Sequence, residues 1–327
     1  MAVPGEPRVA VVGATGAVGG QIVELLAARE FPAAELKLFA TNSGAAGTVQ
    51  SGDDEHLVEA YDEPAKLADF DLAFLAVPEA VANHIAAARL GPVLIDLSAA
   101  SRGGSSPGEL AAPGLTTRER VREIGARGLL GVPHPAAQAL ASCLGALRIS
   151  AGFVAATALL GASSAGRDMI AKTVDQTTDL LRAQLDLEDE PQRAFNALVR
   201  EHERATAANI ARQANLLFAT AAGLAVQVVS IPILHGSALS IGIPAGPGVP
   251  DREDDLERLR TAPGLLLIEP GEPLAIADAV GQEAIMVAAD LSAAGLALFC
   301  AYDNTRLAAL SAVWIAEMLT LESRPAN

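Results

Sequence analysis

Aromatic residues are scarce in this chain. They make up 3% of its 327 residues, although 51% of the residues are hydrophobic. The core must therefore be built from alanine, valine, leucine and isoleucine. That composition favours a buried parallel sheet covered by helices over a β-sandwich with an aromatic core. A chain of this length is expected to form two domains.

Basic residues are also few. The chain has 23 lysines and arginines against 39 acidic residues, which gives a formal net charge of −16. Such a surface repels the phosphate backbone of nucleic acids and anionic lipid headgroups, so we expect neither as a partner. A small anionic or nucleotide ligand remains compatible with this charge, because backbone N–H groups can hold an anion locally.

Cysteine is nearly absent: Cys143 and Cys300 form neither a disulfide framework nor a metal-ligand spacing. The five histidines lack the HExxH pattern, so we expect no metal site. The stretch 213–250 has no charged residue, but asparagine, glutamine and proline interrupt it before it reaches the ~20 apolar residues of a membrane-spanning helix. The N-terminus has no signal-peptide core. These absences predict a cytoplasmic protein.

Strand and helix patterns alternate in the first half. A continuous apolar run at 8–12 ends in glycine, which is typical of a central parallel strand. Further strands are expected at 35–40, 71–77 and 93–97, and helices at 17–30 and 79–89. This alternation predicts an α/β fold with a Rossmann-type doubly wound parallel sheet over residues 1–133.

From about residue 134 onward, the pattern of expected helices and strands changes. Helices are expected at 135–147, 166–185 and 201–222, and strands at 148–160, 226–243, 264–268, 285–289 and 296–302. This mixture predicts an α+β domain of the dehydrogenase dimerisation type over residues 134–303. The segment 304–327 is expected to form a C-terminal helix that returns to the first domain. The acid pairs Asp53-Asp54 and Asp254-Asp255 are interpreted as solvated loop residues.

The strongest local motif is the sequence GATGAVG at 13–19, directly after the first strand and at the start of the first helix. Gly13 allows a tight turn, Gly16 lets the backbone approach a pyrophosphate, and Gly19 permits close packing of helix on sheet. The phosphate would bind free N–H groups at the positive end of the helix dipole. We assign this cradle to Gly13, Thr15, Gly16, Ala17 and Val18. The alternative is a turn that needs its glycines only for packing.

The end of the second strand normally discriminates between cofactors, because an acid there binds the ribose hydroxyls and a base binds a 2′-phosphate. This chain has Thr41, Asn42 and Ser43, which are neither. Their hydroxyl and amide groups can bind a 2′-phosphate, so NADP is favoured over NAD. An ordinary turn, with cofactor binding lost, is the alternative.

Three segments, in order along the chain, resemble aspartate-semialdehyde dehydrogenases: VAVVGATGAVGGQIVELL near the N-terminus, AFNAL at 194–198, and YDNTRLAALSAVWIAEML near the C-terminus. The resemblance covers nearly the whole chain. It implies an NADP-binding domain, a dimerisation domain, a homodimer and a place in amino-acid biosynthesis. Four short patterns resemble the bacterial Usg branch of the family: Asp96–Ser98, Ser163–Arg167, Ala194–Asn196 and Gly236–Ser240.

The resemblance also implies a catalytic cysteine and a catalytic histidine, and this chain departs from both. The position of the family's catalytic cysteine, here called the cysteine slot, is occupied by His134 or Pro135. The position of its catalytic histidine, the histidine slot, is occupied by Ser237. His235 lies two residues before that slot and is not counted as a replacement. Without a thiol the family's thioester intermediate cannot form.

The family also has two functional arginines, and this chain keeps only one of them. The slot of the substrate-binding arginine falls on Ser230, whereas Arg102 remains where the family places its phosphate-binding arginine. A solvated loop arginine is the alternative interpretation of Arg102.

Neither cysteine is expected to replace the missing nucleophile. Cys143 lies about 12 Å along a helix from Pro135, and both cysteines stand in apolar sequence, as buried structural thiols do. The sequence therefore predicts a catalytically degenerate, NAD(P)-binding homodimer. Two alternatives stay open: an active NADP-dependent oxidoreductase for another carbonyl substrate, and a dimeric scaffold without a cofactor.

Overall fold

The computed structural model describes residues 3–41, 47–51, 54–98, 109–149, 152–184, 191–199, 201–219, 222–245, 253–292 and 294–320. The chain forms two compact units. Unit 1 is Met1–His134 with Ala308–Asn327, and unit 2 is Pro135–Leu307.

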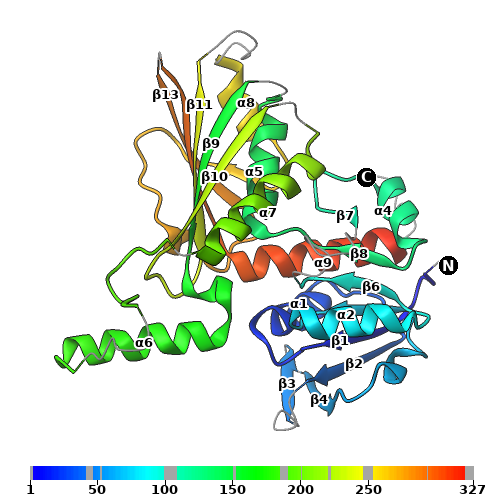
Figure 1. The fold of residues 1–327 in the computed structure, drawn as a ribbon. Helices are drawn as coiled ribbons and strands as arrows, with labels where there is room; N and C mark the ends of the chain where they lie inside the picture. The colour runs from blue at the N-terminus through cyan, green and yellow to red at the C-terminus, as the bar shows by residue number, and fades with distance from the viewer. Residues whose placement is uncertain are drawn as a thin grey trace. The chain divides into compact units, whose positions relative to one another are not determined.

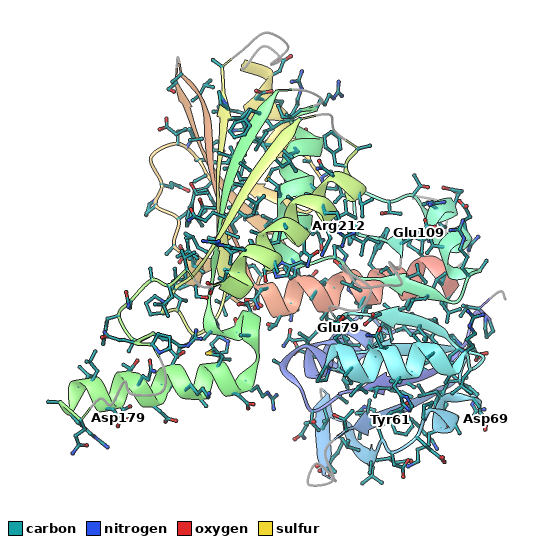
Figure 2. The ribbon with its side chains drawn as sticks, viewed as in Figure 1. Tyr61, Asp69, Glu79, Glu109, Asp179 and Arg212 are labelled. Atoms are coloured by element: carbon teal, nitrogen blue, oxygen red, sulfur yellow. The ribbon has the colours of Figure 1, made fainter. Side chains whose placement is uncertain are left out.

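An eight-stranded sheet forms the centre of unit 1, in the order β3-β4-β2-β1-β5-β6-β8-β7 (Figure 1). Its strands are β1 (Arg8–Val12), β2 (Glu35–Ala40), β3 (Thr48–Ser51), β4 (Asp54–Ala60), β5 (Leu72–Leu75), β6 (Val93–Asp96), β7 (Glu109–Leu110) and β8 (Leu129–Gly131). All neighbours are parallel except β3 and β4. The strand order reverses between β1 and β5, so the predicted doubly wound sheet is confirmed.

Both faces of this sheet are covered, which explains why its central strands are apolar throughout. Val9 and Val11 of β1 belong to a core shared with helices α1 (Ala17–Ala28), α4 (Arg118–Gly125) and α9 (Asn304–Thr320). The alternate residues Ala10 and Val12 pack on the other side. That second core includes residues of α2 (Glu79–Ala88) and of the short 3₁₀ helix η1 (Pro64–Leu67).

Unit 2 contains a six-stranded mixed sheet in the order β10-β9-β11-β14-β13-β12 (Figure 1). The strands are β9 (Phe153–Leu160), β10 (Gly223–Ser230), β11 (Ser237–Pro244), β12 (Leu265–Leu267), β13 (Ile285–Ser292) and β14 (Gly295–Tyr302). Helix α5 (Pro135–Ala146) packs on β11, α7 (Glu201–Leu217) on β10, and α8 (Glu253–Thr261) on β12. This is the second sheet domain that the sequence predicted.

Helix α6 (Arg167–Leu181) projects away from the sheet of unit 2 (Figure 1). Thr173 is the one residue of this helix that is fully buried in the described structure. Gln176 ties α6 to the segment 191–199, because its side-chain oxygen accepts a hydrogen bond from the backbone N–H of Arg193 at 2.8 Å.

Several elements differ from the sequence prediction. The expected strand 148–160 begins only at Phe153, after Arg148 and Gly152 adopt positive φ angles. The hairpin β3–β4 and the helices α4 and α8 were not predicted, because their apolar residues are too few to show a clear period. Among the described helices, none combines the length and apolarity that a bilayer crossing requires.

The interpretation of Asp254-Asp255 as solvated loop residues was wrong for the loop and for the solvation of Asp255, whereas Asp254 is exposed as expected. Both residues lie in the first turns of α8, and Asp255 is only 1% exposed. Its carboxylate accepts a hydrogen bond from Arg258 at 2.9 Å. An arginine three residues after an acid is a helical pair, and that spacing was the available signal.

Candidate functional site

The glycine loop of unit 1 forms a tight turn at the carboxyl end of β1. The N–H of Gly13 donates to the carbonyl of Phe39 on β2 at 2.8 Å. Gly13 has a φ of +89°, and a Cβ atom there would lie 2.2 Å from the carbonyl oxygen of Ala76. Only glycine fits between the ends of the two neighbouring strands, β2 and β5.

Gly16 and Gly19 serve different purposes in this turn. A Cβ atom on Gly19 would lie 2.1 Å from the carbonyl oxygen of Gly13, so α1 can approach β1 only with glycine there. Gly16 is the N-cap of α1, with extended backbone and no side chain to cap the helix. A Cβ atom on Gly16 would lie 3.1 Å from the same Gly13 oxygen, which is tight but not prohibitive.

The start of α1 presents unused hydrogen-bond donors. No described residue accepts a hydrogen bond from the backbone N–H groups of Thr15, Ala17 or Val18. The first turn of the helix also contains no acidic side chain. Free N–H groups and the positive end of the helix dipole are the components of an anion site.

The structure describes some of the residues that were predicted to bind a cofactor. Gly13, Thr15, Gly16, Ala17 and Val18 lie together in the turn and at the start of α1. Thr41 follows β2, the strand that pairs in parallel with β1, and its side chain is exposed. The predicted site residues Asn42, Ser43 and Arg102 lie outside the described residues.

The cysteine slot of the family falls at the start of α5. Pro135 is the first residue of this helix and is buried, and His134 precedes it and is half-buried. Proline is favoured at the first position of a helix, where its missing N–H would have no partner. Its side chain has no nucleophilic group.

The histidine slot holds a hydroxyl in a buried polar network. Ser237 accepts a hydrogen bond from the backbone N–H of Gly161 at 3.3 Å. It donates to the side-chain oxygen of Asn304 at 3.5 Å, and Ser163 donates to the same oxygen at 2.8 Å. Asn304 lies in the C-terminal segment that carries the family resemblance, but sequence analysis missed this network. Ser163 and Asn304, which it joins, are 141 residues apart in the chain.

The slot of the substrate-binding arginine also holds a serine with a partner. Ser230, at the end of β10, donates a hydrogen bond of 2.5 Å to the carboxylate of Glu203 on α7. Glu203 is buried, and sequence analysis did not identify it. His235, by contrast, is exposed.

Both cysteines are buried, as predicted. Their sulfur atoms lie 3.5 Å apart in the core of unit 2. The hydrogen bond with Cys143, together with burial, raises the pKa of the Cys300 thiol well above its ordinary value. A neutral, buried thiol is a poor nucleophile. In the described residues, no group of three or more histidine, cysteine or acidic side chains could hold a metal ion.

A parallel doubly wound sheet with an anion cradle at its first crossover defines the class of NAD(P)-binding Rossmann domains. The model of the semialdehyde dehydrogenase NAD-binding domain matches residues 8–141. The chain is 34% identical to a USG-1 protein homolog of Azotobacter vinelandii, covering 97% of this chain and 98% of that one. A USG-1 protein homolog of Pseudomonas aeruginosa is 30% identical, with coverages of 95% and 97%. The chain therefore belongs to the aspartate-semialdehyde dehydrogenase family, in its USG-1 branch.

One solved structure agrees with this family assignment, and a more distant one shares the fold. A probable aspartate-semialdehyde dehydrogenase from Pseudomonas aeruginosa has a TM-score of 0.83 at 29% identity, covering 96% of this chain and 98% of that one. The aspartate-semialdehyde dehydrogenase of Candida albicans, solved with NADP, has a TM-score of 0.68 at 17% identity, with coverages of 96% and 98%.

Proposed function

We propose that this chain is a cytoplasmic, catalytically degenerate member of its family that binds NAD(P) and forms a homodimer. One observation supports the proposed lack of catalytic activity. The two thiols of the chain are buried against each other, away from the start of α5. The position expected to hold the nucleophile is occupied by His134 or Pro135 instead.

Thioester chemistry needs a thiolate that can reach an aldehyde carbon. Ser237 does not replace the missing histidine, because a serine hydroxyl neither accepts a proton near neutral pH nor carries a positive charge. Ser230 is hydrogen-bonded to an acid and cannot form the charged, two-pronged bond that an arginine makes to a carboxylate.

We therefore expect no phosphate-dependent oxidation of aspartate semialdehyde. The measurement is NADPH formation with the aldehyde and phosphate present, beside an active aspartate-semialdehyde dehydrogenase as the positive control. Turnover at an ordinary enzymatic rate, ~10 per second, would show that the proposal is wrong.

The glycine loop supports the cofactor half of the proposal. The free N–H groups of Thr15, Ala17 and Val18 suit a pyrophosphate, and the backbone at Gly16 leaves room for its approach. We place the adenosine ribose near Thr41, Asn42 and Ser43, whose hydroxyl and amide groups favour NADP over NAD. A bound nicotinamide cofactor would supply hydride transfer, and the chain's own residues would bind and orient it.

A pair of substitutions at Gly16 tests the cradle. Gly16→Asp and Gly16→Asn place side chains of the same shape at the N-cap of α1, and both types favour that position. Both must relieve the same 3.1 Å contact with Gly13. The aspartate adds a negative charge where the pyrophosphate would lie. We therefore expect Gly16→Asp to weaken NADP binding about tenfold or more relative to Gly16→Asn, at similar thermal stability.

Calorimetric titration of the wild type and both variants with NADP and NAD is the measurement. If the wild type binds neither cofactor at millimolar concentration, weaker than about −4 kcal/mol, the cofactor half of the proposal fails. Equal affinities of the two variants would mean that the cofactor does not bind at the start of α1.

The homodimer is supported by the second face of the unit 2 sheet. Helices α5, α7 and α8 cover one face, whereas on the other face Phe153 and Ala155 of β9 are exposed beside Ala225 of β10. The strands β9, β10, β11 and β14 carry no charged residue. This charge-free part of the face, over β9, β10, β11 and β14, is where two copies with a net charge of −16 each can approach.

A further inference from the structure

The two cysteines form an isolated pair in the core of unit 2. Cys143 on α5 and Cys300 on β14 are separated by 157 residues, yet their sulfur atoms are 3.5 Å apart and both side chains are fully buried. Cys300 lies in the interior of the sheet, with Leu239 of β11 and Val287 of β13 as its register partners. The contact therefore joins a buried helix to a central strand.

We propose that Cys143 and Cys300 are a redox pair that a small peroxide converts into a disulfide, which ties α5 to β14. The sulfur atoms of a disulfide are about 2.05 Å apart, so the two atoms need to approach by about 1.5 Å. The proposal requires that side-chain rotations and a slight shift of α5 supply that distance. No third thiol exists in the chain, so the intramolecular product has no competitor within one molecule.

The reaction is a two-electron oxidation of two thiols. One sulfur attacks an oxygen of hydrogen peroxide, the O–O bond breaks, and a sulfenic acid and one water form. The second sulfur then attacks the sulfenic sulfur. The S–S bond forms, the S–O bond breaks, and the departing hydroxyl takes the remaining thiol proton as a second water. One peroxide is thereby reduced to two waters.

Burial determines which oxidants can react. A thiol with a raised pKa and no exposed surface meets a reagent only when the surrounding core opens locally. Hydrogen peroxide is small enough to enter through such openings, whereas bulky disulfides are excluded. The pair therefore reacts slowly but selectively, and a thiol reductant restores it through the same openings.

The disulfide would stabilise unit 2. It closes a loop of 157 residues, and long closed loops remove the most conformational freedom from the unfolded chain. The two sulfurs are already in contact in the folded state, so the strain is limited to the remaining approach of about 1.5 Å. We expect the oxidised protein to melt about 5 °C or more above the reduced protein.

The experiment treats the native, full-length protein with hydrogen peroxide and then blocks the remaining thiols under denaturing conditions. Mass spectrometry should find one cross-linked peptide that joins Cys143 to Cys300, with a loss of two hydrogens. The melting temperature should rise and return to its starting value after dithiothreitol. The variants Cys143→Ala and Cys300→Ala should show neither the cross-link nor the rise.

Three results would overturn the proposal. Both thiols could remain free after native treatment, the sulfurs could oxidise only to sulfinic or sulfonic acid, or the cross-link could form without raising the melting temperature. If an alanine variant folds poorly, the wild type before and after dithiothreitol still decides the matter. The result is independent of cofactor binding, so it can fail while the proposed function holds.

Discussion

At the scale of single residues, two adjacent glycines of α1 have opposite roles. A Cβ atom on Gly19 would lie 2.1 Å from the backbone oxygen of Gly13, whereas one on Gly20 would lie 3.8 Å from the oxygen of Ala14. A Cβ atom on Gly19 would therefore push the helix away from the strand, whereas one on Gly20 would make an ordinary van der Waals contact. Packing on the sheet therefore depends on one glycine of the pair.

We expect Gly19→Ala to lower the free energy of unfolding by about 1–3 kcal/mol, because overpacking of a tight contact costs that much. The matched control Gly20→Ala should leave stability unchanged or raise it by about 0.5–1 kcal/mol, since alanine favours a helix interior. Urea unfolding of both variants is the measurement. Equal effects in the two variants would mean that the close approach at Gly19 relaxes without cost.

At the scale of elements, Asp303 caps the start of α9. Its carboxylate accepts hydrogen bonds from the backbone N–H groups of Thr305 and Arg306, each at 3.0 Å, and from Gly281 at 2.9 Å. Burial alone would raise the pKa of Asp303, but these hydrogen bonds together lower it below its ordinary value. The following residue, Asn304, joins the network of Ser237. The DN pair thus anchors α9 twice.

A lowered pKa in the folded state means that the charged form of Asp303 stabilises the protein. This contribution is fully present above the unfolded pKa of about 3.9 and is lost as the pH falls through the lower, folded value. We expect Asp303→Ala to cost about 0.5–2 kcal/mol at neutral pH, as lost caps do. Asp303→Asn keeps an acceptor but cannot titrate.

Urea unfolding as a function of pH measures both effects. The stability difference between wild type and Asp303→Asn should shrink as the pH falls through the acidic range. A difference that stays constant down to the pH where the carboxyl is protonated would contradict the assigned role of the charge.

At the scale of the whole molecule, the proposed dimer depends on the charge-free part of the open sheet face of unit 2, over β9, β10, β11 and β14. Ala155 of β9 lies on that part of the face, with Ala225 and Gly242 as its register partners. Ala155→Glu would bury a charge in the interface, and we expect it to weaken dimerisation by about 100-fold or more. Sedimentation or light scattering across a concentration series is the measurement.

The control for this variant is Ala87→Glu, which adds the same charge at an exposed position on α2 of unit 1. It should leave the association unchanged. A wild type that is monomeric at micromolar concentration would refute the dimer itself. Equal weakening by both variants would indicate general charge repulsion rather than an interface on this face.

The sequence alone determined the features that depend on near neighbours in the chain. The apolar runs of β1, β5 and β6 identify buried parallel strands, because both faces of each strand must be covered. The glycine spacing at 13–19 identifies the crossover, because the turn demands a positive φ angle and a close approach within a few residues. The same local motifs carried the family resemblance.

The tertiary structure decided the features that join distant parts of the chain. The contact of Cys143 with Cys300 and the bond of Ser230 to Glu203 depend on which strand and helix become neighbours. Likewise, the burial of Asp255 depends on what packs over α8. Hydrophobic periodicity specifies which face of an element is buried, but not against what. Strand order and register make that choice, and they arise only when the whole sheet assembles.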